Sequence, residues 1–182
     1  MKVLGIVGSP HKDGNTANLV EAVLDGAMEQ GNEIKLFHLS DMNIGPLGKA
    51  EGKKVSYPQD DMSKLYPHIE VMGALVLGSP IYYDHVSERT KLFIDRLHYY
   101  SKTHGEEFRR RFPENVKAVT IITYEWEDPE SYQEVLGWIN RTLNHYWSID
   151  VVGSLKAYGT TKNLVSNRKD LLEKGRQMGR TL

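Results

Sequence analysis

The residues best suited to chemistry lie between Gly8 and Thr16, in the segment Gly-Ser-Pro-His-Lys-Asp-Gly-Asn-Thr. Backbone N–H groups, hydroxyls and an amide are concentrated there, and such groups bind anions. The segment follows the apolar run 3–7 and precedes a stretch whose apolar residues fall on one helical face. A helix that begins here directs the positive end of its dipole at the loop, which favours phosphate.

The spacing of the glycines indicates what kind of phosphate could bind. The loop has neither the Gly-x-x-x-x-Gly-Lys-Ser/Thr spacing of a triphosphate loop nor the Gly-x-Gly-x-x-Gly of a dinucleotide site. A single terminal phosphate fits better, and the predicted binding residues are Ser9, His11, Asn15, Thr16 and, at the start of the helix, Ala17. The same residues suit an ordinary strand-to-helix turn with an exposed histidine, so the sequence leaves both interpretations open.

A second Gly-Ser-Pro, residues 78–80, follows another continuous apolar run, 73–77. In a doubly wound sheet of order 2-1-3-4-5 the first and third strands are neighbours, so both loops would face one pocket at the topological switch point. Backbone amides and aromatic rings in the second loop suit a planar heterocycle, and its predicted binding residues are Pro80, Ile81, Tyr82, Tyr83 and Asp84. Aromatic packing at the sheet edge is the alternative for the two tyrosines.

The elements that must position these loops alternate between strand and helix along the chain. Strands are predicted at 3–7, 33–39, 73–77, 116–123 and 151–158, and helices at 16–30, 60–69, 88–100, 129–146 and 164–178. The pattern predicts a single α/β domain, 1–182, with a five-stranded parallel sheet of order 2-1-3-4-5 and helices on both faces. Thr123 ends the fourth strand and Tyr124 follows it, so both lie on the ligand side and are predicted binding residues.

Several charged residues receive structural interpretations. Asp60 and Asp61 are predicted to stabilise a helix N-terminus rather than to form a catalytic pair. Ser87 is expected to cap the helix 88–100, with Arg96 on its wetter face. Asp128 is expected to cap the following helix, with Pro129 at its first position.

The stretch 41–58 is a long loop, predicted to be a lid or a subunit contact, with a mobile surface loop as the alternative. The cluster 109–111 is expected to be a solvated helix end.

Composition excludes several functional classes. The formal net charge of −1 gives no broad attraction to nucleic acid or anionic membranes, and no apolar run approaches the length of a membrane span. The absence of cysteine excludes disulfides, thiolate nucleophiles and clusters held by the chain's own thiolates. The histidines are scattered, so no metal is expected, and no catalytic acid or base is identified. A buried-type strand at the start suggests no signal peptide, so a cytoplasmic location is expected.

Taken together, the motifs resemble the flavodoxin-like NAD(P)H-dependent FMN reductase and iron–sulfur flavoprotein family. The resemblance is carried by residues 8–16, 78–82 and 91–96 and covers roughly the first hundred residues. It implies FMN, with its phosphate on the first loop and its isoalloxazine along 80–84, whose backbone N–H groups would stabilise the negative charge of the reduced flavin. It also implies homodimers or homotetramers with flavin sites near subunit interfaces.

Two departures from the family pattern bear on this expectation. Members of the iron–sulfur branch carry clustered cysteines after the second strand, but residues 43–50 contain none, so a cluster is not expected. In many relatives the third loop is glycine-rich, whereas in this chain it is Thr-Tyr-Glu-Trp, residues 123–126. That difference leaves open how the far edge of the flavin is contacted.

The resemblance implies an FMN-dependent oxidoreductase that passes hydride or electrons from NADH or NADPH to a quinone, a flavin or another small acceptor. The chemistry would belong to the cofactor, which agrees with finding no side-chain acid or base. One alternative is a flavodoxin-type electron carrier, against which the near-neutral charge argues because such carriers are often strongly acidic. The other is a phosphate-ligand-binding module without flavin, suggested by the unusual third loop.

Overall fold

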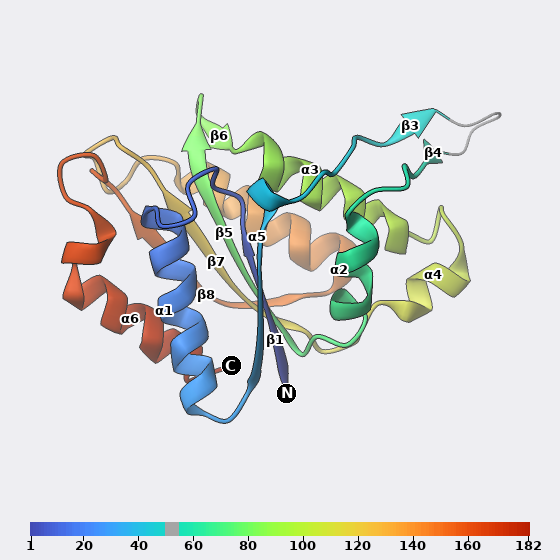
Figure 1. Ribbon diagram of the computed structural model, residues 1–182, viewed down its shortest axis with the longest axis horizontal. Coiled ribbons are helices and arrows are strands. Elements are labelled where there is room, and N and C mark those ends of the chain that lie inside the picture. Colours follow the sequence, from blue (N-terminus) through green and yellow to red (C-terminus); the bar gives the residue numbers. More distant parts are fainter. Residues whose placement is uncertain (50–54) are drawn as a thin grey trace.

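The central sheet contains five parallel strands. The structure is a computed structural model, and it describes residues 1–49 and 55–182. In spatial order these strands are β2 (Glu33–His38), β1 (Lys2–Val7), β5 (Ala74–Tyr82), β7 (Lys117–Thr123) and β8 (Asp150–Ala157) (Figure 1). This is the predicted order 2-1-3-4-5, so the flavodoxin-like α/β fold is confirmed. The half-exposed β2 lies at an edge, as its alternating sequence indicates.

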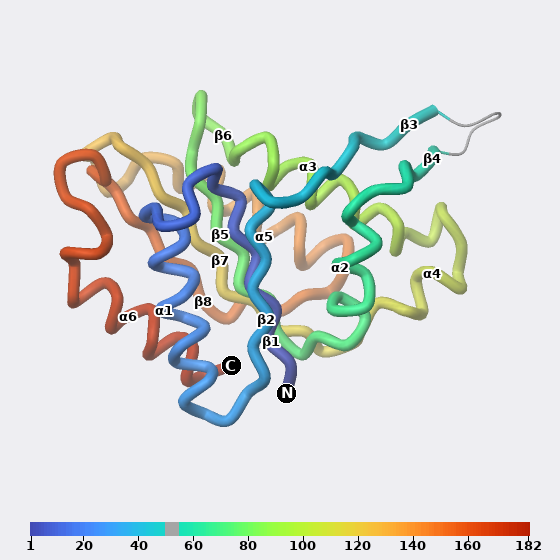
Figure 2. The backbone as a smooth tube through the Cα atoms, viewed as in Figure 1, coloured from blue at the N-terminus to red at the C-terminus, as the bar shows by residue number. Residues whose placement is uncertain are grey.

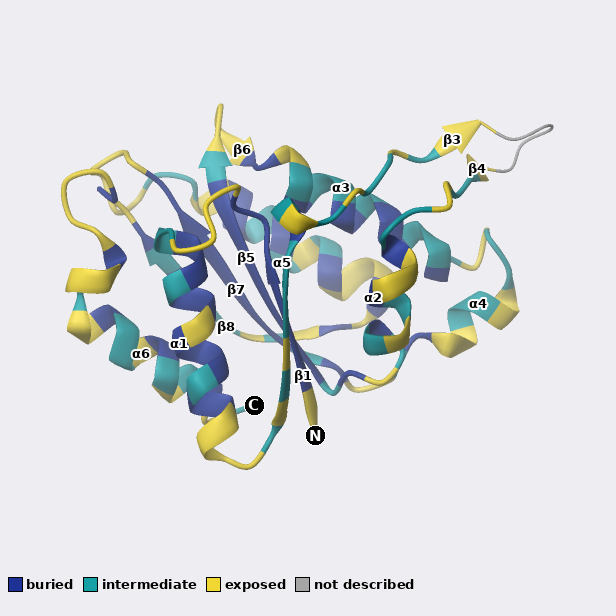
Figure 3. Ribbon diagram, in the orientation of Figure 1, coloured by how far each residue is buried: buried dark blue, intermediate teal, exposed yellow. Residues whose placement is uncertain are grey.

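Helices cover both faces of the sheet, because successive strand residues point to opposite sides. Val3 and Val7 pack in one hydrophobic cluster with α1 (Asn15–Glu29) and α6 (Lys169–Gly179). Leu4 and Ile6 pack in a second cluster. Its helices are α2 (Met62–Ile69), α3 (Glu88–Arg96) and α5 (Gln133–Trp147). The buried residues therefore form two layers, one on each side of the strands (Figure 3).

Helices α1 and α6 lie so close together that only glycine fits at two of their contacts. A Cβ atom at Gly26 would lie 2.0 Å from the carbonyl oxygen of Arg176, and one at Gly179 would lie 1.9 Å from that of Val23. Both neighbours are backbone atoms, which cannot move aside without disturbing a helix. This contact fixes α1, whose N-terminus meets the first polar loop, against the C-terminal helix.

The second Gly-Ser-Pro is not a loop, which corrects the sequence prediction. Residues 78–80 continue β5, and the chain turns back only after Tyr82 to form β6 (His85–Val86), antiparallel to β5. The hairpin projects beyond the carboxyl edge of the sheet (Figure 1). Pro80 is tolerated in the strand because it lies near the carboxyl end of β5, beyond Gly78, the last β5 residue paired with β1.

Three predicted helix boundaries are also wrong. Asp128 does not cap α5; it accepts hydrogen bonds from the Glu130 N–H (3.0 Å) and the Ser131 hydroxyl (3.1 Å) in a separate turn, and the helix begins only at Gln133. Helix α6 begins at Lys169, after the 3₁₀ turn Val165–Asn167. Helix α3 ends at Arg96 and continues as the 3₁₀ turn Leu97–Tyr100. The predicted cap of α3 is confirmed, since the Ser87 hydroxyl accepts from the Thr90 N–H.

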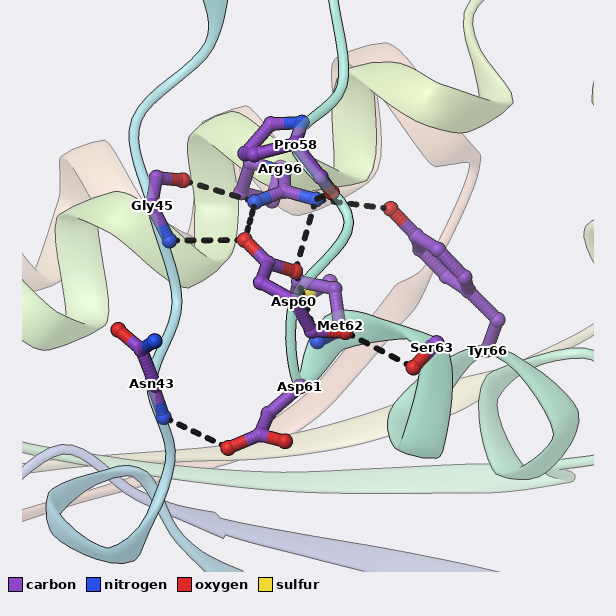
Figure 4. A network of polar contacts seen from close by, with 9 residues as sticks. All are labelled: Asn43, Gly45, Pro58, Asp60, Asp61, Met62, Ser63, Tyr66 and Arg96. Atoms are coloured by element: carbon purple, nitrogen blue, oxygen red, sulfur yellow. Dashed lines mark hydrogen bonds and ion pairs between the residues drawn. The ribbon is translucent and has the colours of Figure 1, made fainter.

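Arg96 is buried, which corrects its placement on the wetter helix face. Its guanidinium forms an ion pair with the buried carboxylate of Asp60, and it donates to the carbonyl oxygen of Gly45 at 2.7 Å (Figure 4). The Asp60 carboxylate also accepts from the backbone N–H groups of Gly45 (2.8 Å) and Met62 (3.0 Å). Burial alone would raise the pKa of Asp60, but these hydrogen bonds outweigh it and lower the pKa below 3.8. Asp60 therefore accepts a hydrogen bond at the start of α2, as predicted, and in addition connects that helix to α3 through Arg96.

The segment 41–58 extends away from the sheet in its described parts, residues 41–49 and 55–58 (Figure 2). It contains the short antiparallel pair β3 (Gly48–Lys49) and β4 (Val55–Ser56), while residues 50–54 lie outside the described residues. Its proposed role as a lid or subunit contact stays a prediction. The cluster 109–111 forms the last turn of α4 (Glu106–Arg111). Among the described residues, no helix combines the length and hydrophobicity needed to cross a bilayer.

Candidate functional site

The carboxyl ends of β1, β5 and β7 meet at one edge of the sheet, as the predicted site requires. Val7 is paired with Gly78, and Pro80 is paired with Thr123. Beyond the last β1 residue, the Gly8 N–H still donates to the Gly78 carbonyl oxygen at 2.8 Å. The first polar loop and the β5–β6 hairpin therefore begin side by side, at the switch point of the sheet.

A buried serine joins these two segments. The Ser87 hydroxyl donates to the Gly8 carbonyl oxygen at 2.8 Å, and the Ser87 N–H donates to the Ser79 hydroxyl at 3.0 Å. Gly8 itself cannot carry a side chain, since a Cβ atom would lie 1.8 Å from the Thr90 hydroxyl oxygen. The position of the first loop is thus fixed by the residue that also caps α3.

The start of α1 is suited to an anion. No side chain caps this helix at its N-cap, Gly14, in contrast to α3, which Ser87 caps. Its first turn contains no acidic residue. The first N–H groups of any helix lack partners within the helix, and here they add to the positive end of a 15-residue dipole. This donor set fits a phosphate group.

The predicted phosphate residues divide into two groups. The Ser9 hydroxyl is buried in the loop and accepts from the His11 N–H at 3.1 Å, while the His11 side chain is exposed. Asn15 instead connects the start of α1 to the loop after β8. Its side-chain oxygen accepts from the Val165 N–H at 2.8 Å, and its amide nitrogen donates to the Thr160 carbonyl oxygen at 3.4 Å. These bonds give Asn15 a structural role, whereas Ser9 keeps its hydroxyl hydrogen for a ligand.

Thr16 reaches the third wall of the site. Its hydroxyl oxygen lies 2.6 Å from that of Thr123, at the end of β7, and both side chains are buried. Only one of the two hydroxyl hydrogens is needed for this contact, so the other remains available to a ligand. Ala17, in the same first turn, is fully buried and could offer only its backbone N–H.

The β5–β6 hairpin presents the aromatic residues of the second loop. Ile81 pairs with Val86 and Tyr82 with His85, leaving Tyr83 and Asp84 as a two-residue turn. Both turn residues have positive φ, 46° and 61°, as a type I′ turn requires. Tyr83 is fully exposed, and Tyr82 is exposed as well, with a relative exposure of 41%. The turn therefore places both tyrosines at the hairpin end, and their contact with a planar ligand stays a prediction.

The segment after β7 contains the predicted Tyr124 and a second residue, Tyr132, that sequence reasoning missed. Tyr124 is buried, and its hydroxyl donates to the carbonyl oxygens of Asp128 (3.2 Å) and Pro129 (3.3 Å). Desolvation, followed by the charge of Asp128, raises the pKa of Tyr124 to about 12. Next to it, the Tyr132 hydroxyl donates to Asp84 at 2.9 Å. No local signal marks Tyr132, because its partner lies 48 residues away in the sequence.

Two hollows differ in their relation to this edge. A pocket of about 430 Å³ lies against the hairpin turn and is lined by Asp84, Trp126, Glu130, Ser131, Tyr132 and Glu134. A groove of about 910 Å³ lies elsewhere, between α3 and α5, where Lys91 and His98 face Trp138 and Tyr146. The larger hollow is thus separate from the switch point.

Comparison with known proteins agrees with this geometry. Residues 1–124 match the family model described as NADPH-dependent FMN reductase, and this stretch contains all three walls of the site. The chain belongs to this family. It is similar to an iron–sulfur flavoprotein of Archaeoglobus fulgidus, 31% identical over 182 residues, which are 98% of this chain and 77% of that relative.

Two further similarities define the extent of the match. An iron–sulfur flavoprotein of Methanocaldococcus jannaschii is 36% identical over 101 residues, which are 53% of this chain and 51% of that protein. The solved NAD(P)H:quinone oxidoreductase of Methanothermobacter marburgensis has a TM-score of 0.72 at 19% identity, covering 100% of this chain and 96% of its own. Within this FMN reductase family, the chain is a flavin-dependent oxidoreductase with FMN as its flavin. Its sequence has no cysteine to hold an iron–sulfur cluster.

Proposed function

We propose that residues 1–182 form a single FMN-binding domain that acts as an NAD(P)H-dependent oxidoreductase. The observation that carries this proposal is the uncapped start of α1, beside Ser9 and the Thr16–Thr123 pair. When bound, FMN supplies the hydride and electron transfer between NADH or NADPH and a quinone, a flavin or another small acceptor. The protein itself needs to supply only binding, orientation and electrostatics.

We assign the phosphate end of FMN to the first loop and to the start of α1. Ser9 and Thr16 offer hydroxyls, Ala17 offers a backbone N–H, and His11 is exposed and free to approach a phosphate oxygen. Asn15 contributes by holding the loop against residues 160 and 165. These roles follow from which donors remain unused within the protein.

We assign the ring end of FMN to the hairpin and to the end of β7. Residues 80–84 offer backbone groups and aromatic surface, while Thr123 and Tyr124 close the opposite side. Backbone N–H groups here would favour negative charge on the reduced ring. The acidic residues around the neighbouring pocket leave this side of the site polar and open to solvent.

Absorbance spectroscopy tests the proposal. The purified protein is mixed with micromolar FMN, freed of unbound flavin and then treated with NADH or NADPH without oxygen. A retained yellow flavin that bleaches on addition of either nicotinamide supports the proposal. A flavin reduced only by a protein partner would indicate an electron carrier, and failure to retain FMN would indicate a phosphate-ligand-binding module without flavin.

We also propose a homodimer or homotetramer, as the family resemblance implies, and a cytoplasmic location. The groove between α3 and α5, lined by the exposed Tyr146 and the partly buried Trp138, offers a surface for subunit contact. Light scattering coupled to size exclusion tests the assembly: the mass of one chain, 20.8 kDa, would contradict it. Cell fractionation tests the location.

A further inference from the structure

Three strained residues meet beside the proposed flavin ring site. Tyr83, Asp84 and Tyr132 have φ values of 46°, 61° and 62°, in the left-handed region that side chains other than glycine disfavour. Such conformations persist where the surrounding structure holds them, and they gather at functional sites. Asp84 and Tyr132 are also bonded to each other, since the Tyr132 hydroxyl donates to the Asp84 carboxylate at 2.9 Å.

This hydrogen bond joins two separate segments. Asp84 lies in the turn of the hairpin that projects beyond the sheet (Figure 1), and Tyr132 immediately precedes α5. The Tyr132 ring packs edge-on against Tyr124, with centroids 5.0 Å apart and an interplanar angle of 77°. Tyr124 is in turn buried and fixed by two hydrogen bonds at the end of β7. The turn is therefore held to the sheet through Tyr132.

The protonation state of Tyr132 suits this role. Its hydrogen bond to Asp84, followed by desolvation and nearby carboxylates, raises the pKa of Tyr132 above its ordinary value of 10.0. The hydroxyl thus keeps its proton and donates to a carboxylate, which makes a charge-assisted hydrogen bond. Without that hydroxyl, the hairpin turn would lose its connection to the β7 side of the site.

We propose that Tyr132 is a positioning residue for the flavin-dependent reaction, holding the Tyr83–Asp84 turn in the place where it contacts the flavin ring. The inference rests on the proposed function. It separates two parts of the site: Ser9 and Thr16 act on the phosphate, whereas Tyr132 acts through the hairpin on the ring. A change at Tyr132 should therefore affect FMN and riboflavin alike.

The variant Tyr132→Phe tests this proposal, because it keeps the ring that packs on Tyr124 and removes only the hydroxyl. We expect the affinities for FMN and riboflavin to fall by the same factor, about threefold to tenfold for one hydrogen bond. The visible circular dichroism and the midpoint potential of the bound flavin should also change. If the variant keeps wild-type affinities, circular dichroism and potential, the inference is wrong.

Three further variants sharpen the test. Asp84→Asn keeps a side-chain oxygen that can accept from Tyr132 but loses the charge, so it should lose less flavin affinity than Asp84→Ala, which should behave like Tyr132→Phe. The double variant Tyr132→Phe/Asp84→Ala should be no worse than either single variant, since both remove the same bond. Effects that add fully would contradict a shared role. Because Asp84→Ala alters a different residue, the test does not depend on one variant folding.

A matched control separates this inference from the function on which it rests. Tyr99→Phe removes a hydroxyl that accepts a hydrogen bond from Arg111 of α4 at 3.0 Å, away from the hairpin, and should leave all flavin properties unchanged. If the wild-type protein binds FMN and Tyr132→Phe behaves like this control, only the inference fails. If the wild-type protein binds neither flavin, the proposed function fails as well.

Discussion

Two polar regions of the molecule use their hydrogen-bonding groups differently: one pairs charged groups within the protein, and the other leaves donors without protein partners. Around Arg96, the buried guanidinium meets the carboxylate of Asp60 and the carbonyl oxygen of Gly45, and the carboxylate also accepts from backbone N–H groups (Figure 4). At the carboxyl edge, the start of α1 has no side-chain cap, and Ser9 and Thr16 keep donor capacity.

This contrast separates stability from ligand binding. A buried charge network whose members bond one another holds segments together, and removing one member leaves the others desolvated without a partner. A site whose donors lack protein partners can give them to a ligand. We therefore expect substitutions around Arg96 to change the free energy of unfolding and substitutions at the edge to change flavin affinity.

The largest effect is expected for Arg96→Met. It leaves the buried carboxylate of Asp60 without its cationic partner, which should lower the free energy of unfolding by about 3–5 kcal/mol. Urea denaturation of the apoprotein measures this change. The double variant Arg96→Met/Asp60→Leu should recover part of the loss, because it removes both charges. If Arg96→Met alone is as stable as wild type, the Arg96 region does not stabilise the fold and the contrast with the ligand-binding edge is wrong.

The next effect concerns the phosphate end of the site. The double variant Ser9→Ala/Thr16→Ala should weaken FMN binding by at least about 100-fold, since hydrogen bonds to a charged group contribute about 1.5–3 kcal/mol each. Riboflavin, which lacks the phosphate, should bind with nearly unchanged affinity. Fluorescence titration measures both affinities.

A matched control removes the same two hydroxyl types elsewhere. Ser63→Ala/Thr181→Ala changes exposed residues away from the edge and should leave FMN affinity at the wild-type value. Equal weakening of FMN and riboflavin by Ser9→Ala/Thr16→Ala would show that the loop does not bind the phosphate.

A smaller effect is expected from acid. The pKa of Asp60 is lowered in the folded protein, so its contribution to stability is present above the unfolded value near 3.8 and disappears as pH falls through the folded pKa. The stability difference between wild type and Asp60→Asn should therefore narrow when denaturation is repeated from pH 7 down to pH values below about 3.8. A difference that stays constant on acidification would argue against an ionised Asp60.

The smallest effect is expected at an exposed ion pair of the carboxyl edge. Lys162 and Glu127 pair on the surface, with side chains 74% and 63% exposed. Such pairs contribute little, so Lys162→Ala should change the free energy of unfolding by less than about 0.5 kcal/mol. Thermal denaturation measures it, and a loss of several degrees would mean that edge charges do stabilise the fold.

Much of the fold follows from local patterns. The apolar runs 3–7, 73–77 and 116–123 predict buried parallel strands, and the single-faced pattern after Thr16 predicts α1. The boundaries that failed depend on contacts made elsewhere. Asp128 followed by proline is a common helix start, yet its side chain caps a separate turn. The burial of Arg96 depends on Asp60, 36 residues away.

The candidate site was predictable in its composition but not in its connections. Sequence reasoning found the two Gly-Ser-Pro segments and their shared edge because parallel strands end on the same side, but it took the second segment for a loop. It missed the β5–β6 hairpin, since the turn residues Tyr83 and Asp84 lack the usual Asn-Gly signal. The apolar pair Ile81 and Val86, flanking that turn, was the available sign. Tyr132 had no such sign, because only the folded chain brings it to Asp84.

The most direct measurement is the affinity of the wild-type protein for FMN and for riboflavin under the same conditions. If the uncapped start of α1 and its loop bind the phosphate, FMN should bind at least about 100-fold more tightly than riboflavin, a difference of about 2.7 kcal/mol. Equal affinities, or no binding of either flavin, would contradict the assignment of this edge as the flavin site.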